Sequence, residues 1–222
     1  MIVLAFDTAM AACSVALWRN GTTLAAQRSL MERGQAEHLA PMIAAVMAEA
    51  KVGFESLDRI AVTVGPGSFT GVRVALAAAH GLALARKLPI IGLTTGEVLA
   101  AQAAVTDGAA AVVSLIDSKR GDVYVESFGP GAMRRTMAVV MSPAEVATWL
   151  QDLKDTGTVV LVGDGVGTIA IPRQPRFRHV AEIVFPDAAV LAQEAARHAP
   201  PTSAPVPLYV RPPDVTMPAT AS

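Results

Sequence analysis

The stretch Arg59–Gly71, RIAVTVGPGSFTG, decides the fold of this chain of 222 residues. An apolar strand over residues 57–64 runs into the glycine-rich loop 65–71, and an alanine-rich helix over residues 72–86 follows. A strand, a glycine turn and a helix in this order are typical of α/β proteins, and the free backbone N–H groups of such a helix start can bind an anion. The loop lacks the lysine of a P-loop, and Pro66 removes one backbone donor. The alternative is a structural turn, in which glycine lets the helix approach the sheet closely.

The residues before this loop predict an antiparallel meander followed by a helix. Strand-like runs cover residues 2–7, 14–18 and 22–29, and the last two are joined by Asn20-Gly21, a strong signal for a β-hairpin. Apolar residues then recur at helical spacing over residues 35–51, where Pro41 predicts that the helix begins or bends. A strand over 89–93 and a helix over 97–105 follow the loop helix, which completes the order βββαβαβα.

The second half of the chain repeats the pattern of the first. An apolar strand over 111–116 ends at Asp117, as the first strand ends at Asp7, and a second strand covers 122–128. Residues 159–165 echo residues 60–65, because both are apolar strands that enter a Gly-x-Gly turn. These matches predict an internal duplication. We expect a first domain over 1–106 that carries the partner-binding helices and a smaller second domain over 107–199, which ends in a helix over 187–198. A proline-rich tail over 200–222 is expected to follow, with Leu208–Val210 docked as an edge strand.

Asp7 and Asp117 are the acidic candidates for a nucleotide site. In folds of the actin, Hsp70 and hexokinase type, two strand–turn–strand units face each other across a cleft that holds ATP phosphates and Mg²⁺. An aspartate at such a strand end can instead accept N–H bonds within its own turn. Both alternatives are open for Asp7, whereas the neighbouring Lys119 and Arg120 favour the structural role for Asp117. The candidate phosphate contacts are therefore Asp7, Gly65, Gly67, Ser68, Thr70 and Gly71.

Composition restricts the classes of function. The 18 basic and 19 acidic residues leave a net charge of -1, which gives no general attraction for nucleic acid. Cys13 is the only cysteine, so an intramolecular disulfide and a thiolate metal cluster are excluded. The four histidines never recur at a metal-ligand spacing, and no catalytic residue is assigned. The first residues lack a basic region before their apolar run and indicate a strand, so we expect a cytoplasmic protein without a membrane span.

The two helices before and after the glycine loop are apolar beyond a single stripe. A helix that is apolar all round is covered on both sides, and in a chain of this size a second protein is a good candidate for one of them. This indicates a dimer or heterodimer formed through helices. The residues expected near the partner are His38, Leu39, Met42, Ala45, Val46, Phe69, Arg73 and Leu76.

Several motifs together resemble the TsaB (YeaZ) family, and the resemblance covers nearly the whole chain to about residue 211. The specific motif is the run from Gly65 to Ala77, and it is supported by LAFDT at 4–8, CSVAL at 13–17, EHLAP at 37–41, PIIGL at 89–93, residues 117–124 and PLYVR at 207–211. The resemblance implies an α/β fold with two duplicated, actin-like (ASKHA, ribonuclease H-like) subdomains. It also implies a non-catalytic subunit of the machinery that transfers a threonylcarbamoyl group to N6 of adenosine 37 in tRNA.

The family's catalytic relative, TsaD, carries a His-x-x-x-His metal site after the same Pro-x-Ile-Gly pattern. Those positions fall at about Thr95 and Leu99 here, and neither side chain can replace a histidine ligand. The resemblance thus implies a scaffold that pairs with TsaD, works with the ATPase TsaE, meets tRNA through the complex and forms a homodimer without its partner. No cofactor is assigned to the chain itself, although ATP or ADP at the partner interface fits the family. The alternative is an ATP-dependent small-molecule kinase that uses Asp7, the 65–71 loop and Gly163–Gly167. A third possibility, a glycoprotease, is disfavoured because the histidine pair is missing.

Overall fold

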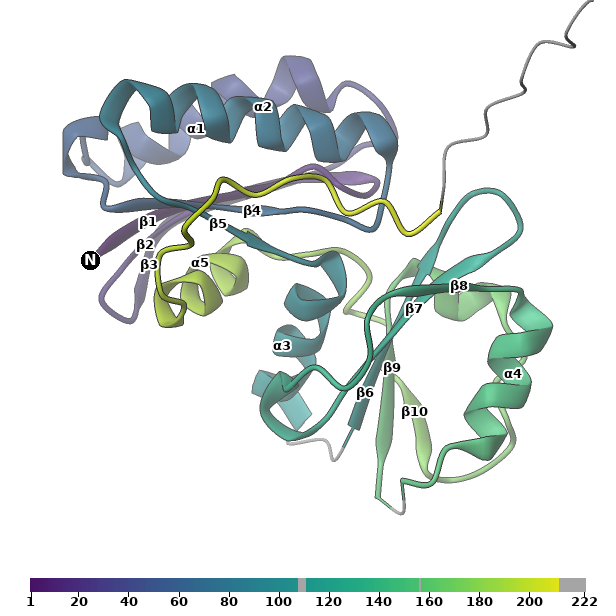
Figure 1. Ribbon diagram of the computed structural model, residues 1–222. Helices are drawn as coiled ribbons and strands as arrows, with labels where there is room; N and C mark the ends of the chain where they lie inside the picture. Colours follow the sequence, from purple (N-terminus) through teal and green to yellow (C-terminus); the bar gives the residue numbers. More distant parts are fainter. Residues whose placement is uncertain (108–110, 156, 212–222) are drawn as a thin grey trace, which may run out of the picture.

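The chain folds around two mixed five-stranded sheets, and the computed structural model describes residues 1–107, 111–155 and 157–211. Figure 1 shows the two sheets side by side, each with helices packed on it. The first sheet has the strand order β3-β2-β1-β4-β5. Its strands are β1 (Ile2–Asp7), β2 (Ala12–Arg19), β3 (Thr22–Leu30), β4 (Arg59–Thr63) and β5 (Ile90–Leu93). The second sheet has the order β10-β9-β6-β7-β8 and consists of β6 (Ala111–Asp117), β7 (Val123–Phe128), β8 (Val139–Met141), β9 (Val159–Val162) and β10 (Phe177–His179).

The two sheets have the same topology, which confirms the predicted duplication. In the first, β1 pairs antiparallel with β2 and parallel with β4, and β2–β3 and β4–β5 complete the sheet. In the second, β6 pairs antiparallel with β7 and parallel with β9, with β7–β8 and β9–β10 outside them. Asp7 and Asp117 therefore stand at equivalent ends of the two central strands. Gly65 and Gly163 likewise follow the equivalent strands β4 and β9, as the repeat in the sequence predicted.

The helices sandwich both sheets. Figure 1 shows α1 and α2 together on one face of the first sheet, with α5 on its other face. The second sheet lies between α3 and α4, and α3 also contacts α5. The helices are α1 (Gln35–Glu49), α2 (Phe69–Arg86), α3 (Thr95–Asp107), α4 (Pro143–Asp152) and α5 (Ala188–Arg197), with 3₁₀ turns η1 (Phe54–Ser56), η2 (Pro130–Ala132) and η3 (Asp164–Thr168). The position that α2 holds in the first half is thus taken by the single turn η3 in the second.

Helix α5 departs from the expected domain division. We expected the second domain to run to residue 199, whereas α5 packs on β1 and β2 of the first sheet. Its residues Ala188, Leu191, Ala192 and Ala195 are fully buried in one cluster with Val3, Ala5 and Trp18. The physical reason is that both faces of the first sheet are apolar, and α1 and α2 cover only one of them.

Helix boundaries also differ from the prediction, because of caps that the apolar pattern does not record. Helix α2 begins at Phe69 rather than 72, since the Ser68 side chain accepts a bond from the Gly71 N–H. Helix α3 begins at Thr95 rather than 97, where Thr94 and Glu97 cap each other at 3.0 and 2.6 Å. Helix α1 begins at Gln35 and contains Pro41, which is exposed, so water can solvate the carbonyl group that the proline leaves unbonded.

The tail after α5 returns across the first sheet. The Leu208 N–H donates to Val64 O over 2.8 Å, but residues 205–211 do not form a strand. Residues 212–222 of the expected tail lie outside the described residues. Among the described residues, no helix combines the length and the apolar character needed to cross a bilayer.

Candidate functional site

A large cleft lies between the two sheets, at the end where β1 and β6 stop. Its volume is about 960 Å³. Several segments line it: the turn after β1, the start of α1 with the residues before it, the glycine loop with the start of α2, the turn after β6, the starts of β7 and η3, and the tail. The lining includes Gly67, Ser68, Phe69, Arg73, Ile116, Asp117, Lys119, Tyr124, Asp164 and residues 208–211. This is where the duplication places a nucleotide in actin-like folds, so the chemistry of its walls decides what it can hold.

The glycine loop packs tightly against the turn after β1. A Cβ atom at Gly67 would overlap the backbone oxygen of Ala9, and one at Gly71 would overlap that of Thr8. Two bonds tie the segments together: the Ser68 N–H donates to Ala9 O over 2.6 Å, and Thr8 Oγ1 donates to Gly71 O over 2.6 Å. The alternative of a structural turn therefore accounts for these two glycines. Of the loop candidates, only Gly67 and Ser68 line the cleft, while Gly65 and Gly71 are buried and Thr70 is exposed outside it.

Asp7 is fully buried and does not line the cleft. Its Oδ1 accepts bonds from the Ala9 N–H over 3.1 Å and from the Thr63 hydroxyl group, while Oδ2 has no hydrogen-bond partner among the described residues. Burial raises the pKa of this carboxyl group to about 6, although the bonds from Thr63 and Ala9 act in the opposite direction. Asp7 therefore stabilises the turn between β1 and β2 by accepting an N–H bond within it, which is the structural role considered for this residue.

The equivalent residue of the second half, Asp117, forms an ion-pair cluster at the cleft wall. Lys119 Nζ lies 3.1 Å from Asp117 Oδ2 and 2.9 Å from Asp164 Oδ2. Asp164 also accepts the Asp117 N–H over 2.9 Å, so the three side chains link the turn after β6 to η3. Burial lowers the pKa of Lys119, but the hydrogen bonds and charges of Asp164 and Asp117 together outweigh this effect and raise the pKa above its ordinary value. The expected structural role of Asp117, with Lys119 as its partner, matches this arrangement.

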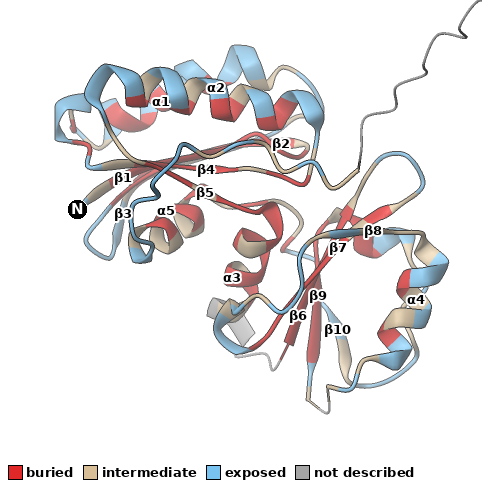
Figure 2. Cartoon of the chain, in the orientation of Figure 1, coloured by how far each residue is buried: buried red, intermediate tan, exposed pale blue. Residues whose placement is uncertain are grey.

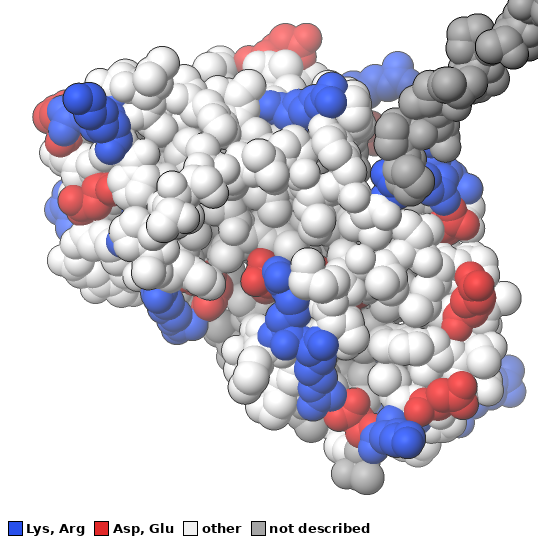
Figure 3. Space-filling view, viewed as in Figure 1, with Lys and Arg blue, Asp and Glu red and all other residues white. Residues whose placement is uncertain are grey.

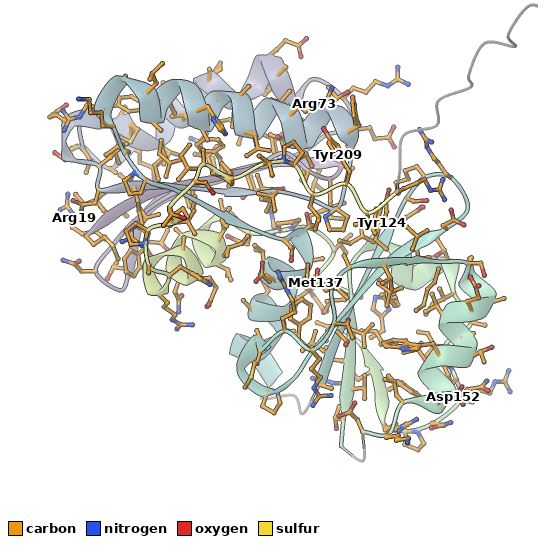
Figure 4. The ribbon with its side chains drawn as sticks, in the orientation of Figure 1. Arg19, Arg73, Tyr124, Met137, Asp152 and Tyr209 are labelled. Atoms are coloured by element: carbon orange, nitrogen blue, oxygen red, sulfur yellow. The ribbon has the colours of Figure 1, made fainter. Side chains whose placement is uncertain are left out.

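The cleft mouth carries an aromatic and arginine cluster that involves the tail. The rings of Phe69 and Tyr209 stack with centroids 5.7 Å apart, and the guanidinium carbon of Arg73 lies 3.7 Å from the Phe69 ring centroid. Arg73 Nε donates to Tyr209 Oη over 2.9 Å. Figure 4 shows Arg73 and Tyr209 next to each other beside α2, with Tyr124 of the second half farther along. The sequence singled out Phe69 and Arg73 for the partner surface, whereas Leu208–Val210 was expected only to dock as an edge strand, with no contact predicted for the Tyr209 side chain.

The outer face of α1 and α2 holds some of the expected partner residues but not all. Leu39, Val46 and Leu76 are buried in the core of the first sheet, so the helical phase chosen for them was wrong. Figure 2 shows the buried residues of both helices on the side facing the sheet and the exposed ones outside. His38, Ala45, Phe69 and Arg73 are exposed, and Met42 is half-buried. Leu84 also belongs to this face and is 83% exposed, although the sequence reasoning did not select it.

A partly buried charge cluster joins α3 to the second sheet, and sequence reasoning missed it. Arg134 Nη2 lies 2.7 Å from Glu97 Oε2 on α3, and its Nε lies 2.9 Å from Glu126 Oε1 on β7. Thr94 Oγ1 donates to Glu126 Oε2 over 3.0 Å. Burial raises the pKa of Glu126 to about 7, and Glu97 adds to the rise, while Arg134 and Thr94 oppose it. The only local signal was Thr94-x-x-Glu97, which is a capping-box pattern.

The counterparts of a metal-binding histidine pair fall in the sequence at about Thr95 and Leu99, which lie on the same helix as Glu97. Thr95 and Leu99 are fully buried on α3. Within residues 1–107, 111–155 and 157–211, no three His, Cys, Asp or Glu side chains gather in a way that could hold a metal ion. Figure 3 shows acidic and basic side chains interspersed on one face of the molecule, in keeping with the net charge of -1.

Comparison with known proteins points in one direction. A family model described as TsaD, tRNA N6-adenosine threonylcarbamoyltransferase, matches residues 28–159. The tRNA threonylcarbamoyladenosine biosynthesis protein TsaB of Escherichia coli K12 is 40% identical over 124 residues, a match that spans 56% of this chain and about half (53%) of that protein. The protein of the same name from Buchnera aphidicola subsp. Schizaphis graminum is 30% identical over 195 residues, which cover 84% of this chain and 89% of that one.

Two solved structures have the same overall fold along nearly the whole chain. A Pseudomonas aeruginosa protein described as similar to peptidase YEAZ superposes with a TM-score of 0.83 at 30% identity, over 95% of this chain and 99% of that one. A structure named YeaZ, from the same organism, superposes with a TM-score of 0.79, also at 30% identity, over 94% and 99% of the two chains. These matches extend through both sheets, so they confirm the predicted fold of two duplicated, actin-like α/β halves.

Proposed function

The chain belongs to the TsaB (YeaZ) family, and from that premise we propose that it is a non-catalytic subunit of the machinery that makes N6-threonylcarbamoyladenosine at position 37 of tRNA. In this role it holds a TsaD-type catalytic subunit in its active arrangement. It works together with a TsaE-type ATPase and meets tRNA through the complex. Such a role implies a cytoplasmic location.

The observation that carries this proposal is the outer face of α1 and α2, which is exposed in the part of the chain that the structure describes. Along α2 the exposed positions Phe69, Arg73, Ala77 and Leu84 fall on one stripe, since they are separated by whole helical turns. On α1 the exposed residues Pro41, Ala44, Ala45 and Ala48 are small or apolar. An exposed apolar patch across two adjacent helices is typical of a protein–protein interface. We assign it to the catalytic subunit, and to a second copy of this chain when that subunit is missing.

The assignment as a non-catalytic subunit is supported by α3. A threonylcarbamoyl transfer of the TsaD kind uses a metal bound by two histidines, and the equivalent Thr95 and Leu99 side chains here are enclosed in the core. A leucine offers no ligand atom, and a threonine hydroxyl is a poor substitute for imidazole. The metal chemistry is therefore assigned to the partner.

The kinase alternative receives less support from the cleft. Its acidic candidate, Asp7, is buried away from the cleft, and the glycines that were to approach a phosphate instead approach the backbone of Thr8 and Ala9. Lys119 is engaged by two carboxylates. The scaffold role is therefore our single proposed function.

The test is tRNA modification in a reconstituted mixture of threonylcarbamoyl-adenylate, the catalytic subunit and the ATPase, with and without this chain. We expect product only when the chain is present. Met42→Glu should abolish both product and binding to the catalytic subunit, because it places a carboxylate in the apolar face. Met133→Glu is the matched control, since Met133 is 70% exposed on the other half of the molecule. Product that forms equally well without the chain, or with the Met42→Glu variant, would show the proposal to be wrong.

A further inference from the structure

The tail segment 205–211, which we call the strap, crosses from the first half of the molecule to the second. At its start, Pro205 O lies 3.2 Å from His80 Nε2 on α2. In its middle, the Leu208 N–H donates to Val64 O. At its end, Arg211 forms an ion pair with Asp122, in the turn between β6 and β7. Figure 1 shows this segment running along the first sheet toward the second before the described residues end.

Between these anchors, the strap places Tyr209 on the first turn of α2. Tyr209 receives the bond from Arg73 and stacks on Phe69, so each of the three side chains contacts the other two. Yet Phe69 remains 57% exposed and Tyr209 50% exposed. Two half-exposed aromatic rings and an arginine that fix one another's rotamers lose little conformational entropy when a partner covers them. Tyrosine and arginine are also the residue types that dominate interface hot spots.

The position of this cluster connects it to the apolar face of α1 and α2. Phe69 and Arg73 begin the exposed stripe that continues along α2 through Ala77 to Leu84. Tyr209 widens the first turn of that stripe, although it lies 136 residues from Arg73 in the chain. The arginine offers guanidinium N–H groups beyond the Nε that Tyr209 uses, and these fit a carboxylate.

We propose that Phe69, Arg73 and Tyr209 form one contact cluster for the catalytic subunit, and that the strap holds Tyr209 in it. This inference rests on the proposed function. The partner presents a carboxylate to the outer edge of Arg73 and an apolar side chain to the two rings. Because the strap also ends on Asp122, the cluster depends on an anchor in the second half of the molecule.

Isothermal titration of the catalytic subunit into the full-length chain tests this inference. Tyr209→Ala should weaken binding by about tenfold or more, because it removes an aromatic anchor and frees Phe69 and Arg73. Tyr209→Phe keeps the stack and should retain most of the affinity. Asp122→Asn releases only the far anchor and should weaken binding by roughly two- to fivefold. Val206→Ser is the matched control, because Val206 is a 73% exposed strap residue outside the cluster, and it should bind like the parent chain.

Comparison with Met42→Glu separates this inference from the proposed function. If Tyr209→Ala binds like the parent while Met42→Glu does not bind, the cluster assignment is wrong and the scaffold role stands. Tighter binding by Tyr209→Ala would mean that the strap covers the interface instead of contributing to it, which also overturns the inference. If the parent chain itself does not bind the catalytic subunit, both the inference and the proposed function fail. Circular dichroism spectra that match the parent's confirm that the variants are folded.

Discussion

At the scale of single residues, the buried carboxyl group of Asp7 makes stability depend on pH. Its pKa is raised from 3.8 to about 6 in the folded chain, so folding favours its protonated form. Below pH 3.8 the carboxyl group is protonated in both the folded and the unfolded chain, so it does not oppose folding. Between pH 3.8 and 6 the unfolded chain ionises first, and the group opposes folding more as the pH rises. Above pH 6 the group is charged in both states and the penalty is constant. By the size of this shift, the ionised carboxylate destabilises the fold by on the order of 2 to 3 kcal/mol.

We therefore expect Asp7→Asn to be more stabilising at pH 8 than at pH 4. The amide oxygen can still accept the bonds from Ala9 and Thr63, and the variant removes the buried charge. Urea unfolding of both chains between pH 4 and pH 8 measures the difference in free energy of unfolding. Asp152→Asn controls for the loss of one negative charge, since Asp152 is exposed on α4. A constant difference between Asp7→Asn and the parent across this range would contradict the prediction.

At the scale of elements, the loop from Gly65 to Gly71 packs the start of α2 against the end of β1. Position 71 has no room for a side chain, because a Cβ atom would overlap Thr8 O. At Gly81 in the same helix, no atom of the described residues lies within 4 Å of the Cβ position. The two glycines of α2 thus give opposite predictions for the same substitution.

Gly71→Ala should destabilise the chain by roughly 1 to 3 kcal/mol, because α2 or the Thr8 backbone must shift. Gly81→Ala should stabilise it by up to about 1 kcal/mol through the higher helix propensity of alanine. Thermal unfolding monitored by circular dichroism at 222 nm compares the two variants. Equal effects at the two positions would show that close packing does not decide the identity of residue 71.

Whether a feature could be predicted from the sequence depends on how far apart in the chain the residues that specify it lie. The hairpin at Asn20-Gly21 and the strand–loop–helix unit at 59–86 carry local signals and were predicted correctly; Asn20 and Gly21 both adopt the positive φ that this turn needs. Helix α4 was missed, although Ser142 and Glu145 form a capping box at its start and Pro143 is its first residue. Strands β8 and β10 have three residues each and no clear alternation to detect.

The candidate site was predicted less well, since it depends on contacts that are distant in the chain. The helical pattern of α1 and α2 was visible, but the side of each helix that meets the sheet is decided by β2 and β3 for α1 and mainly by β4 for α2. Leu39, Val46 and Leu76 were therefore misplaced. The ion pairs of Arg134 with Glu126 and Glu97 span 8 and 37 positions of the chain, and the stack of Tyr209 on Phe69 spans 140. No local motif marks either arrangement.

At the scale of the whole molecule, Arg134 is the charge that holds Glu97 of α3 and Glu126 of β7 together. Arg134→Met should cost about 3 kcal/mol of stability at pH 8, because two carboxylates are then left close together and one of them is buried. The loss should shrink at pH 5.5, since the pKa of Glu126 is already raised to about 7 and its protonation removes the repulsion. Denaturant unfolding at the two pH values measures this; an equal loss at both would exclude the role assigned to Glu126.

The exchange of helices between the halves has a consequence for the order in which the protein can form. The first sheet is complete once β5 is made, but the helix that covers its second face begins at residue 188. A ribosome that adds about 5 to 20 residues each second therefore leaves that apolar face bare for several seconds. During this interval the nascent N-terminal half is a natural client for a chaperone, and a messenger cut short before α5 would yield an aggregating fragment.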